Sequence, residues 1–407
     1  MTFTTARILS LNGGSSSIKF ALYQAGHTLE RLLGGQIDRI GHGYSQLAFK
    51  HADKRQGSHE VAAADHREAV SSLMAWLASS EGLGSMDAID AIGHRVVHGM
   101  GRTEPATVTP ELVVELRGIT SSDPDHLPGE IALMEAFRQS HPRLPQVACF
   151  DTAFHCHMPR VARLLPIPRR FEAKGIRRYG FHGLSYAFLM EELERLAGTP
   201  VAQERVVLAH LGSGASMAAV MGGQSMDTSM GFTPTAGLPM GTRSGDLDPG
   251  LAAYLERSEQ LSGLEFHDMV NHDSGLLGIS ETSSDVRDLL QHEAADVRAA
   301  EALAVFCYQA KKCIGAYAAV LGGIDTLVFA GGIGENAAPI RARICDGLGF
   351  LGIEIDPARN ASHAAVLSTD SSRVTVRMIR TDEERMIASS VCRVLGLGPR
   401  KPPGASV

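Results

Sequence analysis

The sequence predicts an α/β protein built from two domains with a duplicated core. Its 407 residues exceed the length at which one hydrophobic core keeps growing, so two domains are expected. One local pattern occurs twice, as RILSLNGGSSSIKFALY over residues 7–23 and as RVVLAHLGSGASMAAVMGG over residues 205–223. An apolar run, a Gly/Ser turn and a second strand-like run are typical of a β-hairpin. Two such hairpins opening two halves of a chain indicate an internal duplication, with a cleft between the halves.

Composition and charge narrow the class of protein. Hydrophobic residues make up 44% of the chain and charged residues 20%, as in soluble globular proteins. A net charge of −7 without a basic cluster argues against nucleic acid as the main partner. No segment has the apolar core of a signal peptide or the roughly 18 apolar residues of a membrane-spanning helix. We therefore expect a cytoplasmic protein with no membrane partner, whose six scattered cysteines are reduced.

The first hairpin turn carries polar groups suited to a phosphate. Gly13 and Gly14 let the backbone approach a ligand, and the hydroxyls of Ser15 and Ser17 are hydrogen-bond donors. Lys19 follows as a point charge of the kind that binds phosphate. On composition alone a solvated turn is at least as probable as a phosphate cradle. The second occurrence of the pattern favours the cradle, although aligning Gly13 with Gly212 puts Ala218 in the place of Lys19.

The rest of the first half reads as strands alternating with helices. A helix capped by Asp65 is expected over residues 65–79, a strand over 88–97, a helix over 130–138 and a strand over 146–150. Arg95 lies at the end of the second of these strands, where it is either exposed or meets an anion. Asp151 directly follows a buried strand, where α/β folds place site residues, although a helix cap is equally possible.

The second half continues this alternation. Helices are expected from Ser185 onward and over residues 295–321, where Gly322 provides the C-cap. A long Gly- and Pro-rich loop over residues 228–249 presents Arg243, and loops of this length are usually functional. A strand over 325–330 leads through a glycine turn into a helix near Ala337, which is a suitable anion or nucleotide site. The carboxylates at residues 382–384 are either ordinary helix N-terminal acids or magnesium ligands.

Together these features fit phosphoryl transfer better than other chemistries. Such a reaction needs donors around the phosphates, Mg²⁺ on a carboxylate and cations for the charge on the transferred group. The chain has no GxxxxGK[ST] motif, which excludes a P-loop, and its GGxG turn is a weak match to a dinucleotide-binding fingerprint.

With these features the chain resembles the family of acetate kinase and its short-chain acyl kinase relatives. That family belongs to the actin, hexokinase and Hsp70 phosphotransferase superfamily. The resemblance extends from Leu9 to about Ile387 and rests on motifs in a fixed order: LNGGSSSIK, GHRVVHG, FDTAFH, RRYGFHG, HLGSGAS, DTSMGFTP with GTRSGD, AGGIGEN and TDEE. It implies two duplicated ribonuclease H-like domains with a nucleotide cleft between them. The first would cover residues 1–152, joined by a C-terminal helix at 387–407, and the second residues 153–386.

The resemblance also implies roles for individual residues. Asn12 and Glu383 would hold Mg²⁺ (or Mn²⁺), and Lys19, Ser15 and Ser17 would lie along the transferred phosphate. The residues implied in catalysis are Arg95, Asp151, His182, Arg243 and, less surely because its neighbours differ from the family pattern, His126. Val97, Phe181 and Pro234, with Arg95, would line the acyl pocket. The ATP or ADP would be held by His210, Leu211, Gly212, Ser213, Gly214, Asp285, Val286, Arg287, Gly331, Gly332, Ile333, Gly334, Glu335 and Asn336.

The implied activity is reversible transfer of the ATP γ-phosphate to acetate, giving acetyl phosphate and ADP by direct in-line displacement, in a cytoplasmic homodimer. Departures from the family pattern leave the acid open. Ser213 replaces the usual Asn, Met100 replaces a common Gly, and Asp125 and Leu127 flank His126 within a run that is usually Leu-His-Asn-Pro. Propionate, butyrate or another small acid is therefore an alternative acceptor. A nucleotide-gated ATPase of the actin or Hsp70 type is the alternative of another class.

Overall fold

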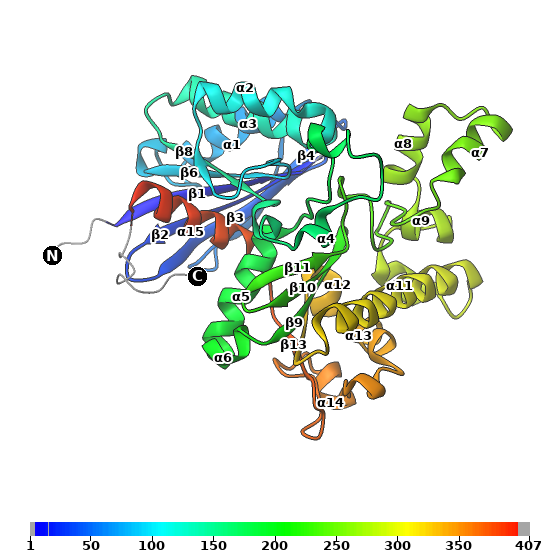
Figure 1. The fold of residues 1–407 in the computed structure, drawn as a ribbon. Helices are drawn as coiled ribbons and strands as arrows, with labels where there is room; N and C mark the ends of the chain where they lie inside the picture. The colour runs from blue at the N-terminus through cyan, green and yellow to red at the C-terminus, as the bar shows by residue number, and fades with distance from the viewer. Residues whose placement is uncertain (1–4, 15, 398–407) are drawn as a thin grey trace. The chain divides into compact units, whose positions relative to one another are not determined.

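The computed structural model describes residues 5–14 and 16–397, which form two compact units (Figure 1). Unit 1 comprises Met1–Ala153 with Asp382–Val407, and unit 2 comprises Phe154–Thr381. Each unit is an α/β layer structure around its own sheet. The last helix of the chain, α15 (Glu383–Leu395), belongs to unit 1, although the segments before it belong to unit 2.

Unit 1 contains an eight-stranded sheet in the order β5-β4-β3-β2-β1-β6-β8-β7. Its strands are β1 (Ala6–Gly13), β2 (Ser17–Ala25), β3 (Leu29–Asp38), β4 (Ser45–His51), β5 (Gln56–Val61), β6 (Ala91–Val96), β7 (Ala106–Thr107) and β8 (Gln146–Phe150). Its other helices are α1 (His66–Ala78), α2 (Pro110–Gly118) and α3 (Leu127–Ser140). Alternation in β2 puts Ile18, Phe20 and Leu22 into the core that α1 and α3 cover, as the sequence pattern predicted.

Unit 2 contains a five-stranded sheet in the order β11-β10-β9-β12-β13. The strands are β9 (Arg205–Leu211), β10 (Ala215–Met221), β11 (Gln224–Thr228), β12 (Thr326–Ala330) and β13 (Thr375–Met378). Helices α5 and α11 flank this sheet on opposite sides (Figure 1). The helices are α4 (Arg160–Arg163), α5 (Gly183–Ala197), α6 (Thr199–Ala202), α7 (Gly250–Ser258), α8 (Gly263–His272), α9 (Gly275–Ser280), α10 (Val286–His292), α11 (Val297–Leu321), α12 (Gly331–Asn336), α13 (Ala338–Cys345) and α14 (Pro357–Ala361).

The two sheets share one topology, which confirms the predicted duplication. In unit 1 the antiparallel strands β3, β2 and β1 are followed by β6 and β8, which run parallel to β1. In unit 2 the antiparallel strands β11, β10 and β9 are followed in the same way by β12 and β13. The predicted fold class, α/β with two duplicated domains, is therefore correct.

The two hairpins differ in the length of their turns, so the sequence alignment across the second hairpin was wrong. Asn12 pairs with Lys19 in the first hairpin, whereas Leu211 pairs with Ala215 in the second. If Gly212 corresponds to Gly13 on the first strand, the second turn is shorter. Ala215, and not Ala218, then stands where Lys19 stands in unit 1. The lysine still has no counterpart in unit 2.

Most predicted elements are present, with shifts at their ends. Asp65 caps α1 by accepting a hydrogen bond from the Glu68 N–H, and Gly322 ends α11 in the left-handed conformation, as expected. The strand predicted over 88–97 begins only at Ala91. The glycine turn after β12 was predicted wrongly, because it is already helical from Gly331. The C-terminal helix predicted over 387–407 instead covers Glu383–Leu395, and residues 398–407 lie outside the described part.

The helices of the described ranges, 5–14 and 16–397, include none with both the length and the apolar character that crossing a bilayer requires.

The packing of α15 onto β6 depends on Gly93. A Cβ at this position would lie 2.3 Å from Cγ2 of Ile387 and 2.7 Å from Cγ2 of Val391, both of them fully buried. We expect Gly93→Val to lower the free energy of unfolding by about 1–3 kcal/mol, because overpacking forces neighbours out of their rotamers. Urea unfolding followed by circular dichroism measures this change.

Gly118→Ala is the control for this prediction, because an added Cβ at Gly118 meets no atom within 4 Å. Equal unfolding midpoints for the Gly93→Val variant and the unmodified chain would show that α15 does not pack tightly on β6.

Candidate active site

The carboxyl ends of three neighbouring strands bring polar residues together in unit 1. Asn12 is near the end of β1, Arg95 is near the end of β6, and Asp151 directly follows β8. Nε and Nη2 of Arg95 donate to Oδ2 of Asp151 over 3.0 and 2.6 Å, and its Nη1 donates to Oδ1 of Asn12 over 3.1 Å. The cation at the end of β6 therefore meets an anion supplied by the protein itself.

Arg95 and Asp151 form an ion pair in which Asp151 is fully buried. Burial opposes the charge on Arg95, but the carboxylates of Asp151 and Glu383 outweigh this effect, so the pKa of Arg95 is raised. Oδ1 of Asp151 is buried and has no hydrogen-bond partner among the described residues. One oxygen of this carboxylate thus orients Arg95, while the other is buried without a hydrogen-bond partner among the described residues.

Two adjacent carboxylates at the start of α15 lie beside this pair. Nδ2 of Asn12 donates to Oε2 of Glu383 over 2.9 Å. Burial raises the pKa of Glu383 although Arg95 opposes the shift, and burial together with the charge of Glu383 raises the pKa of Glu384. The hydroxyl of Tyr23 donates to Asp382, the N-cap of the helix, over 2.8 Å. This corner of unit 1 therefore concentrates negative charge that Arg95 only partly neutralises.

These oxygens fit the chemistry of Mg²⁺. The described residues contain no cluster of three or more His, Cys, Asp or Glu side chains arranged to hold a metal by themselves. Mg²⁺ usually binds through one or two carboxylates and completes its shell with waters and substrate phosphates. The pKa values of Glu383 and Glu384 are raised, as expected for buried neighbouring acids without a cation beside them. A bound cation would favour the charged form of both carboxylates.

Two further acids of this unit were not predicted as site residues. Both oxygens of Glu130, which is buried in α3, accept from the Val97 N–H over 3.1 and 3.2 Å. Oδ1 of buried Asp123 lies 2.8 Å from Nδ1 of His126. Met100 has a φ of 49°, a region that favours glycine. Only the folded structure shows that Glu130 holds the backbone at Val97 and that Asp123 holds the side chain of His126.

The counterpart in unit 2 is built around His182. Its Nδ1 lies 2.8 Å from Oγ of Ser216, and that hydroxyl lies 2.5 Å from the hydroxyl of Tyr186. The His182 ring stacks on His210 at 4.4 Å, and Nδ1 of His210 lies 2.8 Å from Oγ of Ser185. Serine hydroxyls thus hold both imidazole rings at Nδ1. Nε2 of each ring then points away from its serine.

His182 and Arg243 both approach the backbone at Gly214. A Cβ built on Gly214 would lie 3.2 Å from Nε2 of His182 and 3.8 Å from Nη1 of Arg243. Nη1 of Arg243 also donates to the carbonyl of Pro234 over 3.4 Å, which positions the guanidinium from the loop that carries it. The structure thus places two of the predicted catalytic residues and one predicted nucleotide residue close together within unit 2.

The segments predicted to hold the nucleotide also converge in unit 2. Strands β9 and β12 are parallel neighbours, so the turn after Leu211 and the helix start at Gly331 lie side by side. Gly331 has a φ of 76°, and a Cβ there would lie 2.6 Å from the carbonyl oxygen of Leu211. The N–H of Gly241 donates to the carbonyl of Ser213, which connects this turn to the long loop. Glu335 accepts from the N–H groups of Gly331 and Thr381.

The remaining predicted residues are placed as follows. Asp285 caps α10 and accepts from the N–H of Arg287, whose side chain is exposed. Phe181 is buried, and its carbonyl oxygen lies 3.1 Å from Nε2 of His155. Ser15 lies outside the described residues. Ser17 and the exposed Lys19 are on β2 of unit 1.

Comparison with known proteins accounts for this arrangement. Residues 7–389 match the model of the Acetokinase family. The chain belongs to this family. An acetate kinase of Rhodopseudomonas palustris (strain ATCC BAA-98 / CGA009) is 43% identical over 95% of this chain and 98% of its own length. A propionate kinase of Citrobacter rodentium is 42% identical over 95% of this chain and 96% of its own. The crystal structure of Porphyromonas gingivalis acetate kinase covers 96% of this acetokinase and 100% of its own chain, with a TM-score of 0.87 and 36% identity.

The buried ion pair of this acetokinase leads to a prediction about stability. Asp151→Ala leaves the Arg95 guanidinium without its principal partner, so we expect a loss of about 3 kcal/mol in the free energy of unfolding. Urea unfolding at neutral pH measures this loss.

Glu115→Ala is the control, because Glu115 forms an exposed ion pair with Arg102. Loss of this carboxylate should change the unfolding midpoint little. The prediction is contradicted if both variants unfold at the same urea concentration.

Proposed function

We propose that this chain catalyses reversible transfer of the γ-phosphoryl group of ATP to acetate, giving acetyl phosphate and ADP. The observation that carries the proposal is the convergence of Nε2 of His182 and Nη1 of Arg243 beside Gly214, because together they would offer two donors to one anion. Membership of the Acetokinase family and the acetate kinases among its relatives support the same reaction. The propionate kinases among the relatives make propionate the alternative acceptor.

The chemistry requires cations more than it requires a base. An ionised carboxylate is already nucleophilic, so the barrier comes from bringing it to a phosphoryl group that is itself negative. Arg243 would neutralise charge on the transferred group, and His182 would donate a hydrogen bond to it. Arg95, held by Asp151, would bind the acceptor carboxylate from unit 1. Lys19, with Ser17 and Ser15, would lie along the phosphate.

The hydroxyls behind His182 would fix its ring for this task. In the proposed arrangement Tyr186 donates to Ser216, and Ser216 donates to Nδ1 of His182. The neutral imidazole then carries its proton on Nε2, facing the space beside Gly214. A donor that is fixed before the reaction costs no reorganisation when charge develops on the phosphoryl oxygens.

The nucleotide would lie on the adjoining strand ends of unit 2. The turn over residues 210–214, the start of α10 at 285–287 and the helix start at 331–336 supply backbone N–H groups suited to phosphates and ribose. Glu383 and Asn12 would hold Mg²⁺, whose contribution when bound is to neutralise charge on the phosphate oxygens.

The acceptor pocket would be lined by Val97, Phe181 and Pro234, with His126 at its side. Glu130 fixes the backbone at Val97, and Asp123 fixes His126, so these two acids would act as positioning residues. As the family resemblance implies, we also propose a cytoplasmic homodimer, and light scattering after size-exclusion chromatography tests the dimer.

A hydroxylamine trap tests the function and identifies the acid. The chain is incubated with ATP, Mg²⁺ and hydroxylamine over a series of acids, namely acetate, propionate, butyrate and lactate. Acyl hydroxamate formed fastest with acetate is the expected result. A faster reaction with propionate would favour the alternative acceptor, and ATP loss without any hydroxamate would overturn the proposed function in favour of a nucleotide-gated ATPase.

In the same assay Arg243→Ala should lower turnover by about 10³- to 10⁵-fold, the range typical of an arginine that stabilises transferred phosphoryl charge. ADP binding followed by calorimetry should remain nearly unchanged. Arg257→Ala, at an exposed position of α7, is the control for loss of an arginine. Near-normal turnover of Arg243→Ala would remove this residue from the mechanism.

Ser216→Ala tests the positioning of His182. We expect turnover to fall about 5- to 30-fold, with the KM for ATP unchanged, because one hydrogen bond to a buried group is lost. Ser225→Ala is a closely matched control, since Oγ of Ser225 lies at the same 2.8 Å from Nδ1 of buried His155. If both variants lower turnover equally, the effect is one of stability and Ser216 does not act through His182.

A further inference from the structure

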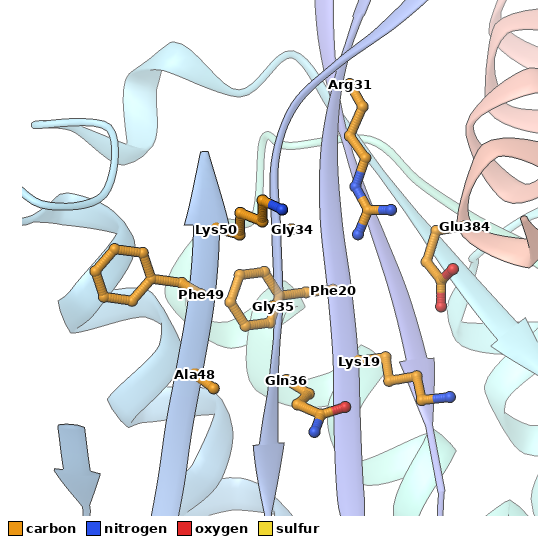
Figure 2. A pocket seen from close by; sticks show the side chains of 10 residues that line it. All are labelled: Lys19, Phe20, Arg31, Gly34, Gly35, Gln36, Ala48, Phe49, Lys50 and Glu384. Atoms are coloured by element: carbon orange, nitrogen blue, oxygen red, sulfur yellow. The ribbon is translucent and has the colours of Figure 1, made fainter. Parts of the chain in front are cut away.

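The second hairpin has an alanine where the first has a lysine. Lys19 extends from β2 in unit 1 (Figure 2), whereas Ala215 stands at the corresponding place in unit 2. The imidazole of His210 lies beside the second turn instead, with Nε2 at 3.8 Å from a Cβ built on Gly212. Whether this nitrogen donates or accepts a hydrogen bond decides whether the ring suits an anion at the turn.

Two hydroxyl groups follow one another on the other side of this ring. Oγ of Ser185 lies 2.8 Å from Nδ1 of His210, and Oγ1 of Thr381 lies 2.7 Å from Oγ of Ser185. Ser185 and His210 are both buried, so a proton left without an acceptor between them would be costly. Each hydroxyl has one proton, so the order of donors along this chain decides which ring nitrogen is protonated.

The proton of Ser185 sets the order. Its hydroxyl has two partners among the residues that the structure describes, Nδ1 of His210 and Oγ1 of Thr381. If Nδ1 donated to Ser185, then Ser185 would donate to Thr381, whose own hydroxyl proton would have no acceptor within the described ranges. If Thr381 donates to Ser185 and Ser185 donates to Nδ1, every proton of the chain is paired. This second order leaves the proton of the neutral ring on Nε2.

The backbone holds the hydroxyl of Thr381 in place. The N–H of Ile379 donates to the carbonyl of Phe329 over 3.0 Å, and the N–H of Thr381 donates to Oε1 of Glu335 over 3.1 Å. The segment after β13 is thus tied to β12 and to α12. A β-branched side chain on a fixed backbone has few rotamers, so its hydroxyl stays directed at Ser185.

We propose that Ser185 and Thr381 are positioning residues for the nucleotide, a step that rests on the proposed function. Thr381 donates to Ser185, Ser185 donates to Nδ1 of His210, and the ring presents its Nε2–H beside Gly212 as a donor to a phosphate oxygen. A neutral donor suits this place because the ring of His182 stacks at 4.4 Å, and two imidazolium ions at that distance would repel each other.

Nuclear magnetic resonance of the full chain tests the position of the proton. With isotopically labelled histidine, correlations between ring protons and ring nitrogens distinguish a protonated from an unprotonated nitrogen, and His210→Gln identifies the signals of this ring. At about pH 8, where an ordinary imidazole is neutral, we expect Nε2 to be protonated and Nδ1 to accept a hydrogen bond. Ser185→Ala should remove the signature of that bond at Nδ1. A proton on Nδ1 of His210 in the unmodified chain would overturn the proposal.

Calorimetric titration with ADP tests the effect on the nucleotide. Ser185→Ala should weaken ADP binding about 5- to 10-fold and Thr381→Val about 2- to 5-fold, since each variant loses one hydrogen bond of the chain. Thr381→Ser keeps the hydroxyl and should bind ADP more tightly than Thr381→Val. In the hydroxamate assay Ser185→Ala should raise the KM for ATP more than it lowers kcat, because His210 holds the nucleotide before and during transfer alike. Ser216→Ala should show the opposite pattern.

Ser225→Ala and Thr199→Val are the matched controls. Oγ of Ser225 lies 2.8 Å from Nδ1 of buried His155, and the hydroxyl of Thr199 donates to Glu194 over 2.8 Å. Thermal unfolding of each variant confirms that it folds. Equal ADP affinities of Ser185→Ala and Ser225→Ala would contradict the proposal, as would equal affinities of the two Thr381 variants.

Failure of this inference is distinct from failure of the proposed function. The proton on the His210 ring is located without substrate, so its position can refute the inference in a chain that still forms acyl hydroxamate. A chain that forms no hydroxamate would contradict the proposed function, whatever the resonance measurement shows.

Discussion

The arrangement of unit 1 depends on the charge of one guanidinium at the end of a buried strand. A cation at this depth is unfavourable unless an acid is buried with it, and Asp151, directly after the neighbouring strand β8, supplies that acid through two hydrogen bonds. The parallel register of β6 and β8 brings the two side chains to the same edge. Arg95 then has one amino group left for Asn12, and through Asn12 it is linked to Glu383 at the start of α15. The charge of Arg95 thus connects three strand ends and the returning C-terminal helix.

The duplicated topology explains why each unit presents polar groups at the same edge of its sheet. Both sheets place a hairpin before two parallel strands, so in each unit a glycine-rich turn lies beside the carboxyl ends of the parallel pair. Unit 1 uses this edge for carboxylates and Arg95, whereas unit 2 uses it for backbone N–H groups and imidazoles. The shorter turn of the second hairpin and the absence of a lysine there suit a backbone site, while Lys19 adds an exposed positive charge beside the first.

Hydroxyl groups hold the histidine side chains of unit 2, as an ion pair holds Arg95 in unit 1. Ser216 and Ser185 hold the two stacked histidines, and Thr381 lies 2.7 Å from Ser185, extending this chain toward Glu335. Neutral hydrogen bonds orient a ring without fixing a charge next to it, so the histidines can face an anion without a competing carboxylate at Nδ1. Supporting interactions of this kind join residues far apart in the chain, from α5 to the segment before α15.

The sequence by itself determined the elements that depend on local patterns. Hairpins, caps and the duplication follow from periodicity, glycine and the capping acid Asp65, which act over a few residues. The motifs around Arg95, Asp151, His182 and Arg243 were also recognisable as chemical groups at strand ends or in loops. Only the tertiary structure decided how these groups are held. The pairing of Arg95 with Asp151, the buried acid Glu130 beneath Val97 and the hydroxyls behind His182 all join distant segments. Hydrogen bonds of this kind depend on strand register and helix docking, because a shift of one residue turns each side chain to the opposite face.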